Sequence, residues 1–228
     1  MSPQEDSQRY RPSSNLPPVV GGLLALNVLV FLWQLSGSVV PVVSMALWPL
    51  AEAGRSVVPG AGAPEFHLWQ LLTYGFLHGG VLHLLVNMFA LWMFGTHIEN
   101  LWGSRPFLYY YLFCLVGAGV IQLFVATQAA VGGQVYPTVG ASGGVFGVLL
   151  AFGLMFPNQV ILLLFPPIPM KAKYFVVVYG LFSLWAGFSG SMPGVAHFAH
   201  VGGMAFGYLL IQYWRGRLPI KPRRRLTL

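Results

Sequence analysis

The sequence predicts an all-α membrane protein built as a bundle of six transmembrane helices. Charged residues are scarce, since Asp, Glu, Lys and Arg make up 7% of the 228 residues, whereas a soluble domain carries about 25%. Hydrophobic residues make up 56% of the chain, which is more apolar surface than a soluble domain of this size could bury. The composition excludes a typical cytosolic enzyme, a disordered chain and a nucleic-acid-binding module.

Four long stretches of the chain contain no charged residue, and they set the number of helices. A membrane-spanning helix needs roughly 20 apolar residues. Each of the first two stretches is long enough for one span, once its polar and Gly/Pro-rich flanks are excluded. Each of the last two stretches is long enough for two spans. The stretches are residues 12–51, 66–98, 106–170 and 174–214. We place the spans at residues 18–36, 80–98, 107–126, 141–156, 173–188 and 196–214.

The distribution of Lys and Arg predicts how the bundle sits in the bilayer. With six spans both termini lie on one side, and that side holds every Lys and Arg except Arg55. Cytoplasmic loops carry an excess of positive charge. We therefore expect one domain (residues 18–214) between two cytoplasmic tails, one polar (residues 1–17) and one basic (residues 215–228). The positive side holds Arg9, Arg11, Arg105, Lys171, Lys173, Arg215, Arg217, Lys221, Arg223, Arg224 and Arg225.

The longest connection, residues 37–79, is too apolar for a hydrophilic loop. We expect parts of it to lie in the membrane interface or to re-enter the membrane. Trp48, Trp69 and Tyr74 suit that depth, because Trp and Tyr are enriched where the bilayer meets water.

Two features at the cytoplasmic ends of the spans are interpreted as structural. Glu99 and Arg105 follow the second span, and we expect them to pair or to extend separately into the interface. The proline-rich stretch at residues 165–169 predicts a rigid turn between the fourth and fifth spans.

Polar side chains within the predicted spans give the strongest indication of function, because a polar group in hydrocarbon is costly and needs a partner. His83 and Asn87 are four residues apart, so they share one face of the second span. Two neutral donors on one face suit the binding of an oxyanion. The alternative is a pair of hydrogen bonds that only hold the bundle together.

Ser142 lies among small residues where the fourth span begins, in the run Gly140-Ala141-Ser142-Gly143. A helix N-terminus has free N–H groups and a positive dipole end, so it favours a developing negative charge. The alternative interpretation is close helix packing through Gly143 and Gly147, with Ser142 as one more small residue.

Two histidines, His197 and His200, open the sixth span. Gly203 and Gly207 would let another helix approach closely, which a hydrogen bond of about 2.6–3.2 Å from a histidine to a serine requires. The alternative is a core histidine bonded to a main-chain carbonyl.

All of these polar residues fall at one depth, because the second, fourth and sixth spans start on the same side of the membrane. One cavity could therefore gather a nucleophile, a base and oxyanion donors into a hydrolytic site. The residues concerned are His78, His83, Asn87, Ser142, His197 and His200.

Three short motifs resemble those of the rhomboid intramembrane serine proteases. Residues 140–143 resemble the GxSG motif, residues 83–87 resemble HxxxN, and residues 199–203 with Gly207 resemble the AHxxG segment of the final helix. Their order and their spans match the family as well. The resemblance extends over residues 66–214, and it implies a six-helix rhomboid bundle whose first loop is embedded in the membrane.

The resemblance implies a serine endopeptidase that cleaves transmembrane segments of other membrane proteins without an acidic residue or a cofactor. Ser142 would be the nucleophile and His200 the general base. His83 and Asn87 would form the oxyanion hole with the Ser142 N–H. Further residues near the site would be His78, whose role is less defined, Phe146, against which His200 packs, and His197, which lies nearer the surface and lines the water entry or caps the helix.

The partners implied are transmembrane substrates and the lipid bilayer, with no nucleic acid and with the oligomeric state left open. The resemblance is to rhomboid proteases of the bacterial type, so we expect the chain to lie in a bacterial inner membrane. One departure is Gln70, which follows Trp69 where many family members have arginine. That arginine helps to hold the first loop in those relatives.

Three other functions remain as alternatives. A non-catalytic rhomboid-like protein would bind membrane clients, although such proteins usually lack the serine or the histidine. A metal site could use His78, His83, His197 and His200, but the chain has no HExxH motif and no carboxylate near them to act as a base. A transporter or channel would show a broken-helix inverted repeat, and no such repeat is visible.

Overall fold

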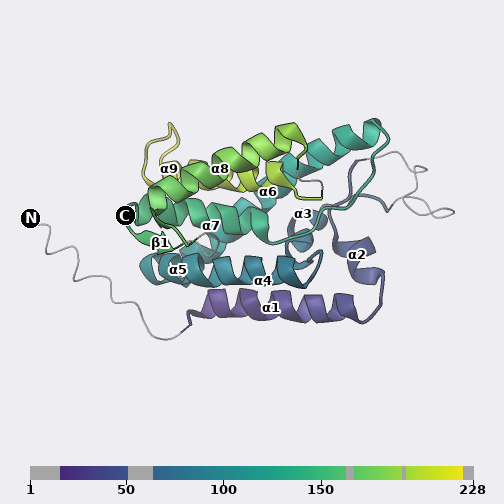
Figure 1. Ribbon diagram of the computed structural model, residues 1–228, viewed down its shortest axis with the longest axis horizontal. Helices are drawn as coiled ribbons and strands as arrows, with labels where there is room; N and C mark the ends of the chain where they lie inside the picture. The colour runs from purple at the N-terminus through teal and green to yellow at the C-terminus, as the bar shows by residue number, and fades with distance from the viewer. Residues whose placement is uncertain (1–15, 51–63, 163–166, 192–193, 223–228) are drawn as a thin grey trace, which may run out of the picture.

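The computed structural model describes residues 16–50, 64–162, 167–191 and 194–222, so much of both predicted tails lies outside the described residues. Long helices run side by side in one bundle (Figure 1). A helix lies at each predicted span, with ends that agree to within a few residues. They are α1 (Pro18–Leu35), the continuous run of α4 (Val81–Ala90), the π-helical turn η3 (Leu91–Gly95) and α5 (Thr96–Trp102), α6 (Ser104–Val131), α7 (Ser142–Met155), α8 (Ala172–Ser189) and α9 (His197–Trp214).

Four helical stretches of the described chain are long and apolar enough to cross a membrane: Pro18–Leu35, Val81–Trp102, Ser104–Val131 and Ala172–Ser189. The chain is a mostly helical, multi-pass membrane protein. Helix α7 has 14 residues, which is about 21 Å of helix and less than the roughly 30 Å hydrocarbon core of a bilayer. Six crossings therefore stay a prediction.

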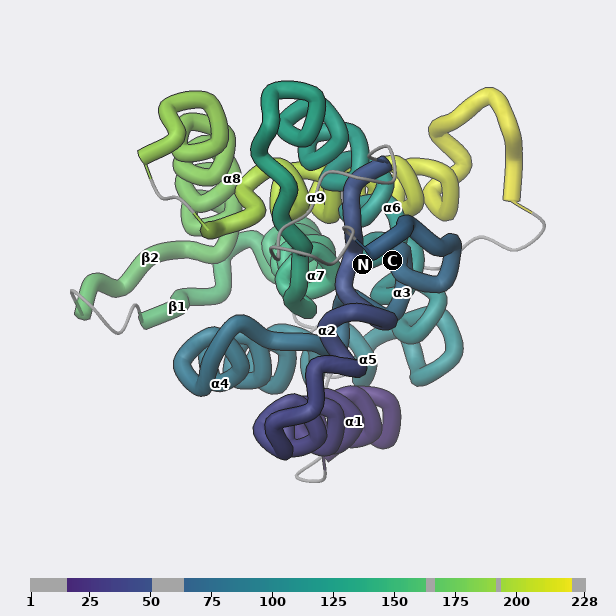
Figure 2. Tube along the Cα trace, turned by 90° about the vertical axis from the view of Figure 1, so that its right-hand side faces the viewer, coloured from purple at the N-terminus to yellow at the C-terminus, as the bar shows by residue number. Residues whose placement is uncertain are grey.

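Helix α7 lies at the centre of the bundle, with α4, α6, α8 and α9 around it (Figure 2). Glycines permit this packing. A Cβ at Gly144 would lie 2.7 Å from the ring of Tyr111. On α9, a Cβ at Gly203 would overlap the main-chain carbonyl of Gly143. The backbones of α7 and α9 are thus in contact, as small residues allow in membrane helices.

The described parts of the connection between α1 and α4 pack on the bundle. They contain α2 (Val40–Met45), α3 (Gln70–Thr73) and the 3₁₀ turn η2 (Tyr74–Phe76). Gln70 is fully buried. It accepts a hydrogen bond from the Trp48 N–H and donates one to the Glu65 carbonyl, each at 3.3 Å. The glutamine therefore ties this connection together where the family that the sequence resembles often has arginine.

Two of the three aromatic residues expected at interfacial depth are buried against the rest of the protein. Tyr74 is 1% exposed and Trp48 is 5% exposed, whereas Trp69 is 54% exposed. The Tyr74 hydroxyl donates a hydrogen bond to the Leu115 carbonyl at 2.8 Å. Because the hydroxyl has this partner, Tyr74 is buried without an unsatisfied donor.

Glu99 faces α1 rather than Arg105. Its carboxylate accepts hydrogen bonds from the N–H groups of Val19 and Val20, at 2.9 and 2.7 Å, and from the Ser104 hydroxyl at 2.7 Å. The first N–H groups of a helix lack partners within it, and the positive end of its dipole attracts a carboxylate. Glu99 is 2% exposed, so the expectation that it pairs with Arg105 or extends into the interface is wrong.

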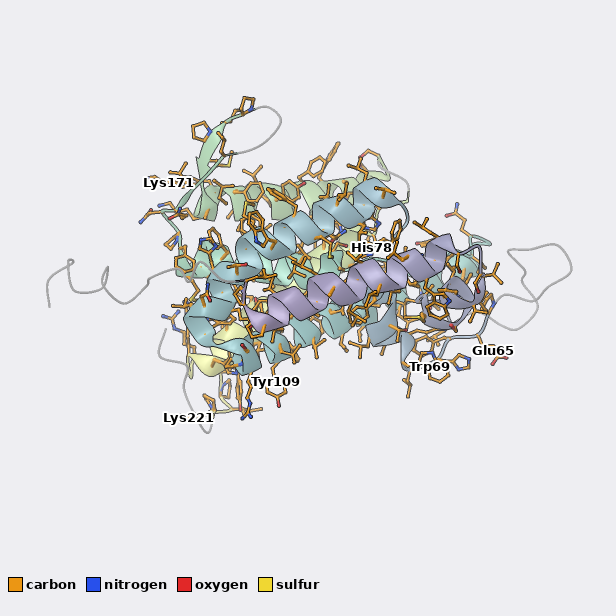
Figure 3. All side chains as sticks on the ribbon, turned by 90° about the horizontal axis from the view of Figure 1, so that it is seen from below. Glu65, Trp69, His78, Tyr109, Lys171 and Lys221 are labelled. Carbon is orange, nitrogen blue, oxygen red and sulfur yellow. The ribbon has the colours of Figure 1, made fainter. Side chains whose placement is uncertain are left out.

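A β-hairpin joins α7 to α8, where the sequence predicted only a turn. Strand β1 (Val160–Leu162) pairs antiparallel with β2 (Pro169–Lys171). Residues 163–166, which include part of the proline-rich stretch, lie outside the described residues. The hairpin projects sideways from the bundle (Figures 2 and 3).

Candidate active site

Ser142 is the first residue of α7, and Ala141 precedes it as the N-cap. Gly140 has a φ of +135°, a conformation that L side chains rarely adopt. The Gly140 N–H donates to the Tyr74 carbonyl at 2.9 Å, so the turn before the serine is fixed to a buried segment. The first N–H groups of a helix have no partner within it, and the Ser142 main chain can therefore donate to a ligand at the positive end of the dipole.

His200 reaches Ser142 from the neighbouring helix α9. Its Nε2 lies 2.9 Å from the serine Oγ, which is hydrogen-bonding distance. The imidazole stacks on the ring of Phe146, with the centroids 4.0 Å apart and 9° between the planes. Gly203 permits this approach, because it brings the α9 backbone against the Gly143 carbonyl.

The second nitrogen of His200 indicates how the ring is held. For Nε2 to accept the Ser142 proton, a neutral imidazole carries its own hydrogen on Nδ1. This Nδ1 is buried and has no hydrogen-bond partner among the described residues. No carboxylate of the described chain orients the ring. The stacking on Phe146 holds the plane of the ring in its place.

His83 presents its Nε2 edge to the turn before Ser142. Its Nδ1 accepts a hydrogen bond from the Gly79 N–H at 3.2 Å, which leaves the hydrogen of a neutral ring on Nε2. A Cβ at Gly140 would lie 3.0 Å from the His83 Nε2 and 3.7 Å from the Ser142 Oγ. The imidazole and the hydroxyl therefore meet around Gly140, and the Nε2–H can donate beside the serine.

Asn87 lies one turn further along α4 than His83. Its Nδ2 donates to the His83 carbonyl at 2.9 Å, and its side chain is buried. An amide carries two N–H groups, so one remains for another acceptor. The α4 helix thus offers two neutral donors, one from each residue.

A family model described as Rhomboid domain matches residues 65–217, a range that includes all of these side chains. The chain belongs to the rhomboid family. This conclusion agrees with the three motifs that the sequence presents.

Relatives of this rhomboid cover most of its length. Presenilin-associated rhomboid-like protein, mitochondrial, of Homo sapiens is 29% identical over 217 residues, covering 88% of this chain and 51% of the relative. Rhomboid protein 1, mitochondrial, of Saccharomyces cerevisiae is 30% identical over 214 residues, covering 91% and 56%. RHOMBOID-like protein 4 of Arabidopsis thaliana is 35% identical over 144 residues, covering 62% and 33%. This chain spans about half the length of the curated relatives it matches, or less.

The names of two of these relatives place them in mitochondria. They give no support to a bacterial inner membrane for this rhomboid, and that location stays a prediction.

Two other histidines of this rhomboid are buried near the site. His78 is 3% exposed, and its ring lies edge-on to His83 with the centroids 5.1 Å apart. Burial, together with the nearby His83, lowers the pKa of His78 to about 4, so the ring is neutral at pH 7. His197 is 6% exposed, and its centroid lies 5.8 Å from that of His200. The His197 side chain is therefore covered by its neighbours, and its place nearer the surface than His200 stays a prediction.

The histidines are arranged as two pairs, His78 with His83 and His197 with His200. Within the described part of the rhomboid, no group of three His, Cys, Asp or Glu side chains could hold a metal ion. The arrangement therefore gives no support to the alternative of a four-histidine metal site.

Two side chains that position the site were not predicted from the sequence. Gln34 of α1 accepts a hydrogen bond from the His78 N–H at 2.9 Å and donates one to the His78 carbonyl at 3.2 Å. Tyr74 holds Gly140 through its carbonyl. Gln34 carried a visible signal, because it is a polar amide in the last turn of an apolar helix. The role of Tyr74 depends on main-chain contacts that leave no mark on the sequence.

Proposed function

We propose that this rhomboid is an intramembrane serine endopeptidase that cleaves transmembrane segments of other membrane proteins. The observation that carries the proposal is the 2.9 Å contact between the Ser142 Oγ and the His200 Nε2. Serine is a weak nucleophile until an adjacent base takes its proton. Here the base lies within reach of a hydroxyl that begins a helix.

In the proposed reaction, the Ser142 Oγ attacks a substrate carbonyl carbon while the His200 Nε2 takes the Oγ proton. The carbonyl electron pair moves to oxygen, which becomes an oxyanion. Collapse of this intermediate expels the amine, which takes the proton from His200, and leaves an ester on Ser142. Water attacks that ester in the same way, releasing a carboxylic acid and restoring the serine.

Three neutral donors would bind the oxyanion: the His83 Nε2–H, the second amide N–H of Asn87 and the Ser142 N–H. Neutral donors suit this place, because a permanent charge within the membrane is costly. Phe146 would hold the His200 ring in the plane that the proton transfer needs. His78 and His197 would support His83 and His200 by packing, and no cofactor takes part in these steps.

The test is co-expression with a reporter that carries a cleavable transmembrane segment. The wild-type chain should cut the reporter, and Ser142→Ala should leave it intact at equal expression. Ser183→Ala is the matched control, because Ser183 is a buried serine on α8 and should leave cleavage unchanged. Cleavage that survives in Ser142→Ala would overturn the proposal.

A fluorophosphonate separates the protease from the alternatives. The reagent should label the purified wild-type chain at Ser142, and a chelator should change neither labelling nor cleavage. A non-catalytic client-binding protein would bind the reporter without labelling or cleavage, and a metal enzyme would lose activity to the chelator.

A further inference from the structure

The β-hairpin between α7 and α8 has two apolar faces. Residues directly opposite in an antiparallel pair share a face, so Val160 lies beside Lys171, and Leu162 lies beside Pro169. This outer face is open, with Val160 55% and Leu162 63% exposed. Ile161, on the inner face, is 7% exposed and packs on the core of the bundle.

An outer face of this composition is unusual for a sheet in contact with water. Antiparallel sheets that are half solvated alternate apolar residues inside with polar residues outside. Here the outer face carries valine, leucine and proline, and lysine is its one polar residue among the described strand positions. Ile168, just before β2, is also 47% exposed. These side chains therefore suit an apolar surrounding on the outer face.

The position of the hairpin indicates what that surrounding is. Strand β2 ends at Lys171 and α8 begins at Ala172, so no linker separates the hairpin from a helix that is long and apolar enough to cross the membrane. Tyr174, on the first turn of α8, is 57% exposed, as expected of aromatic residues at the interface. The hairpin projects sideways from the helices, near the end of the bundle that carries Lys171 (Figure 3).

We propose that the outer face of the hairpin lies in the interface of one bilayer leaflet, with Val160 and Leu162 among the acyl chains and Lys171 bound to anionic phospholipid headgroups. The leaflet is the one on the side of Lys171 and Lys221, at the opposite end of the bundle from Glu65 and Trp69 (Figure 3).

Charge at the base of the hairpin favours an anionic headgroup as the partner. Lys171 lies on the outer face opposite Val160, and Lys173 follows two residues later with its Nζ 5.1 Å from the Tyr174 ring centroid. Both lysines are exposed. Basic residues next to a membrane helix attract anionic lipid, and a long lysine side chain can place its ammonium at headgroup level while its stem stays in apolar surroundings.

The test places a fluorophore on the hairpin of the full chain in lipid nanodiscs. Cys114 is the chain's one cysteine and is fully buried, so the unchanged chain should take no thiol label and an introduced cysteine can be labelled alone. Leu162→Cys and Val160→Cys place the probe on the outer face. Asn158→Cys is the control, because this exposed polar residue precedes the strand.

Two quenchers report the surroundings of the probe: a phospholipid with a nitroxide near its headgroup, and aqueous iodide. Probes at 162 and 160 should be quenched mainly by the spin-labelled lipid, and the probe at 158 mainly by iodide. Quenching of the hairpin probes by iodide alone would overturn the proposal. Protection from both quenchers would also overturn it, because a second copy or another protein would then cover the face.

The headgroup contact is tested by comparing nanodiscs of phosphatidylcholine with and without phosphatidylglycerol. Lys171→Gln should lower the ratio of lipid to iodide quenching about fivefold in the anionic discs, the shift expected for one lysine near an anionic surface. It should change little in neutral discs. Lys221→Gln removes the same charge from the same end of the bundle and should leave the ratio unchanged. A ratio of lipid to iodide quenching that changes neither with Lys171→Gln nor with the anionic lipid would overturn the headgroup contact.

Discussion

Phe146 covers one face of the His200 ring, and this contact holds an imidazole that no carboxylate of the described chain orients. In many serine hydrolases an aspartate fixes the tautomer and the plane of the histidine. Stacking fixes the plane alone. The position of His200 should therefore depend on the shape of its neighbour more than on any charge.

The first prediction follows from this dependence. Phe146→Leu removes the flat surface under His200 and should lower kcat for reporter cleavage roughly 100-fold, the cost of misplacing a catalytic group by about 1 Å. KM should change little. Phe124→Leu, at a residue of α6 that is 67% exposed, is the control and should leave kcat unchanged. An unchanged kcat in Phe146→Leu would show that other contacts hold the ring.

The second prediction concerns the two histidines of α9. His200→Ala should abolish both cleavage and fluorophosphonate labelling of Ser142, because the serine loses the base at 2.9 Å. His197→Ala should keep substantial labelling, since its ring lies 5.8 Å from that of His200, centroid to centroid, and His200 is the histidine within hydrogen-bonding distance of the serine. The reverse result in well-folded variants would assign the base to His197.

The third prediction concerns Asn87. Asn87→Ala should lower kcat roughly 10- to 1000-fold, by comparison with the loss of one oxyanion-hole donor. Its resting hydrogen bond goes to the carbonyl of His83 in its own helix, so the amount of folded protein should change little. A variant that unfolds, but keeps full activity per folded molecule, would show that the amide has only a structural role.

Ser142 and His200 could be placed from the sequence because each belongs to a short motif on a recognisable span, and Phe146 could be placed because it lies one turn after Ser142. The contacts of Gln34 and Tyr74 could not be predicted, although Gln34 stands out as a polar amide in the last turn of an apolar helix. Their partners are main-chain atoms of residues remote in the chain, and a main-chain partner leaves no pattern of residue types.

At the scale of the elements, Glu99 joins two helices. Its carboxylate accepts the N–H groups of Val19 and Val20 at the start of α1. It lies on the helical run that carries His83 and Asn87 at its other end. Contact at Glu99 thus fixes α1 against the helix of the proposed oxyanion donors.

The fourth prediction is that Glu99→Gln lowers the stability of the bundle by about 1–3 kcal/mol. An amide has one acceptor oxygen in place of two, which leaves a buried N–H of α1 without its partner, and it loses the attraction of the charge to the helix dipole. Thermal unfolding in detergent micelles measures the change. Glu65→Gln, at an exposed glutamate, is the control, and equal unfolding temperatures for both variants would contradict the role of Glu99.

The long helices were predictable because each fills an apolar run bounded by charge, proline or glycine. The hairpin was not predictable, since its strands have three residues each and the prolines beside them indicate a turn. The contact of Glu99 with α1 was not predictable either. Arg105 is the opposite charge nearest to Glu99 in the sequence, whereas the partners of Glu99 in the structure lie about 80 residues away. Sequence patterns report local preference and burial, whereas such contacts depend on how helices pack.

At the scale of the whole molecule, the two ends of the bundle differ in chemistry. Lys171 and Lys221 lie at one end, and Glu65 and Trp69 lie at the other (Figure 3). Ser142 and His200 begin or nearly begin their helices, so the proposed active site lies toward the end that lacks these lysines. Substrates would then be cut nearer to one membrane surface than to the other.

The last prediction is the orientation that this asymmetry implies. Positive charge is retained on the cytoplasmic side, so both termini should be cytoplasmic and the site should open to the opposite side. In a bacterial host, a reporter that is active only in the periplasm should stay silent when fused after Leu228. The same reporter fused after Gln134, which follows α6, should be active, because an odd number of spans precedes it. Activity at Leu228 with silence at Gln134 would reverse the orientation. Activity at both positions would contradict six crossings, and with them the shared depth of Ser142, His200 and His83.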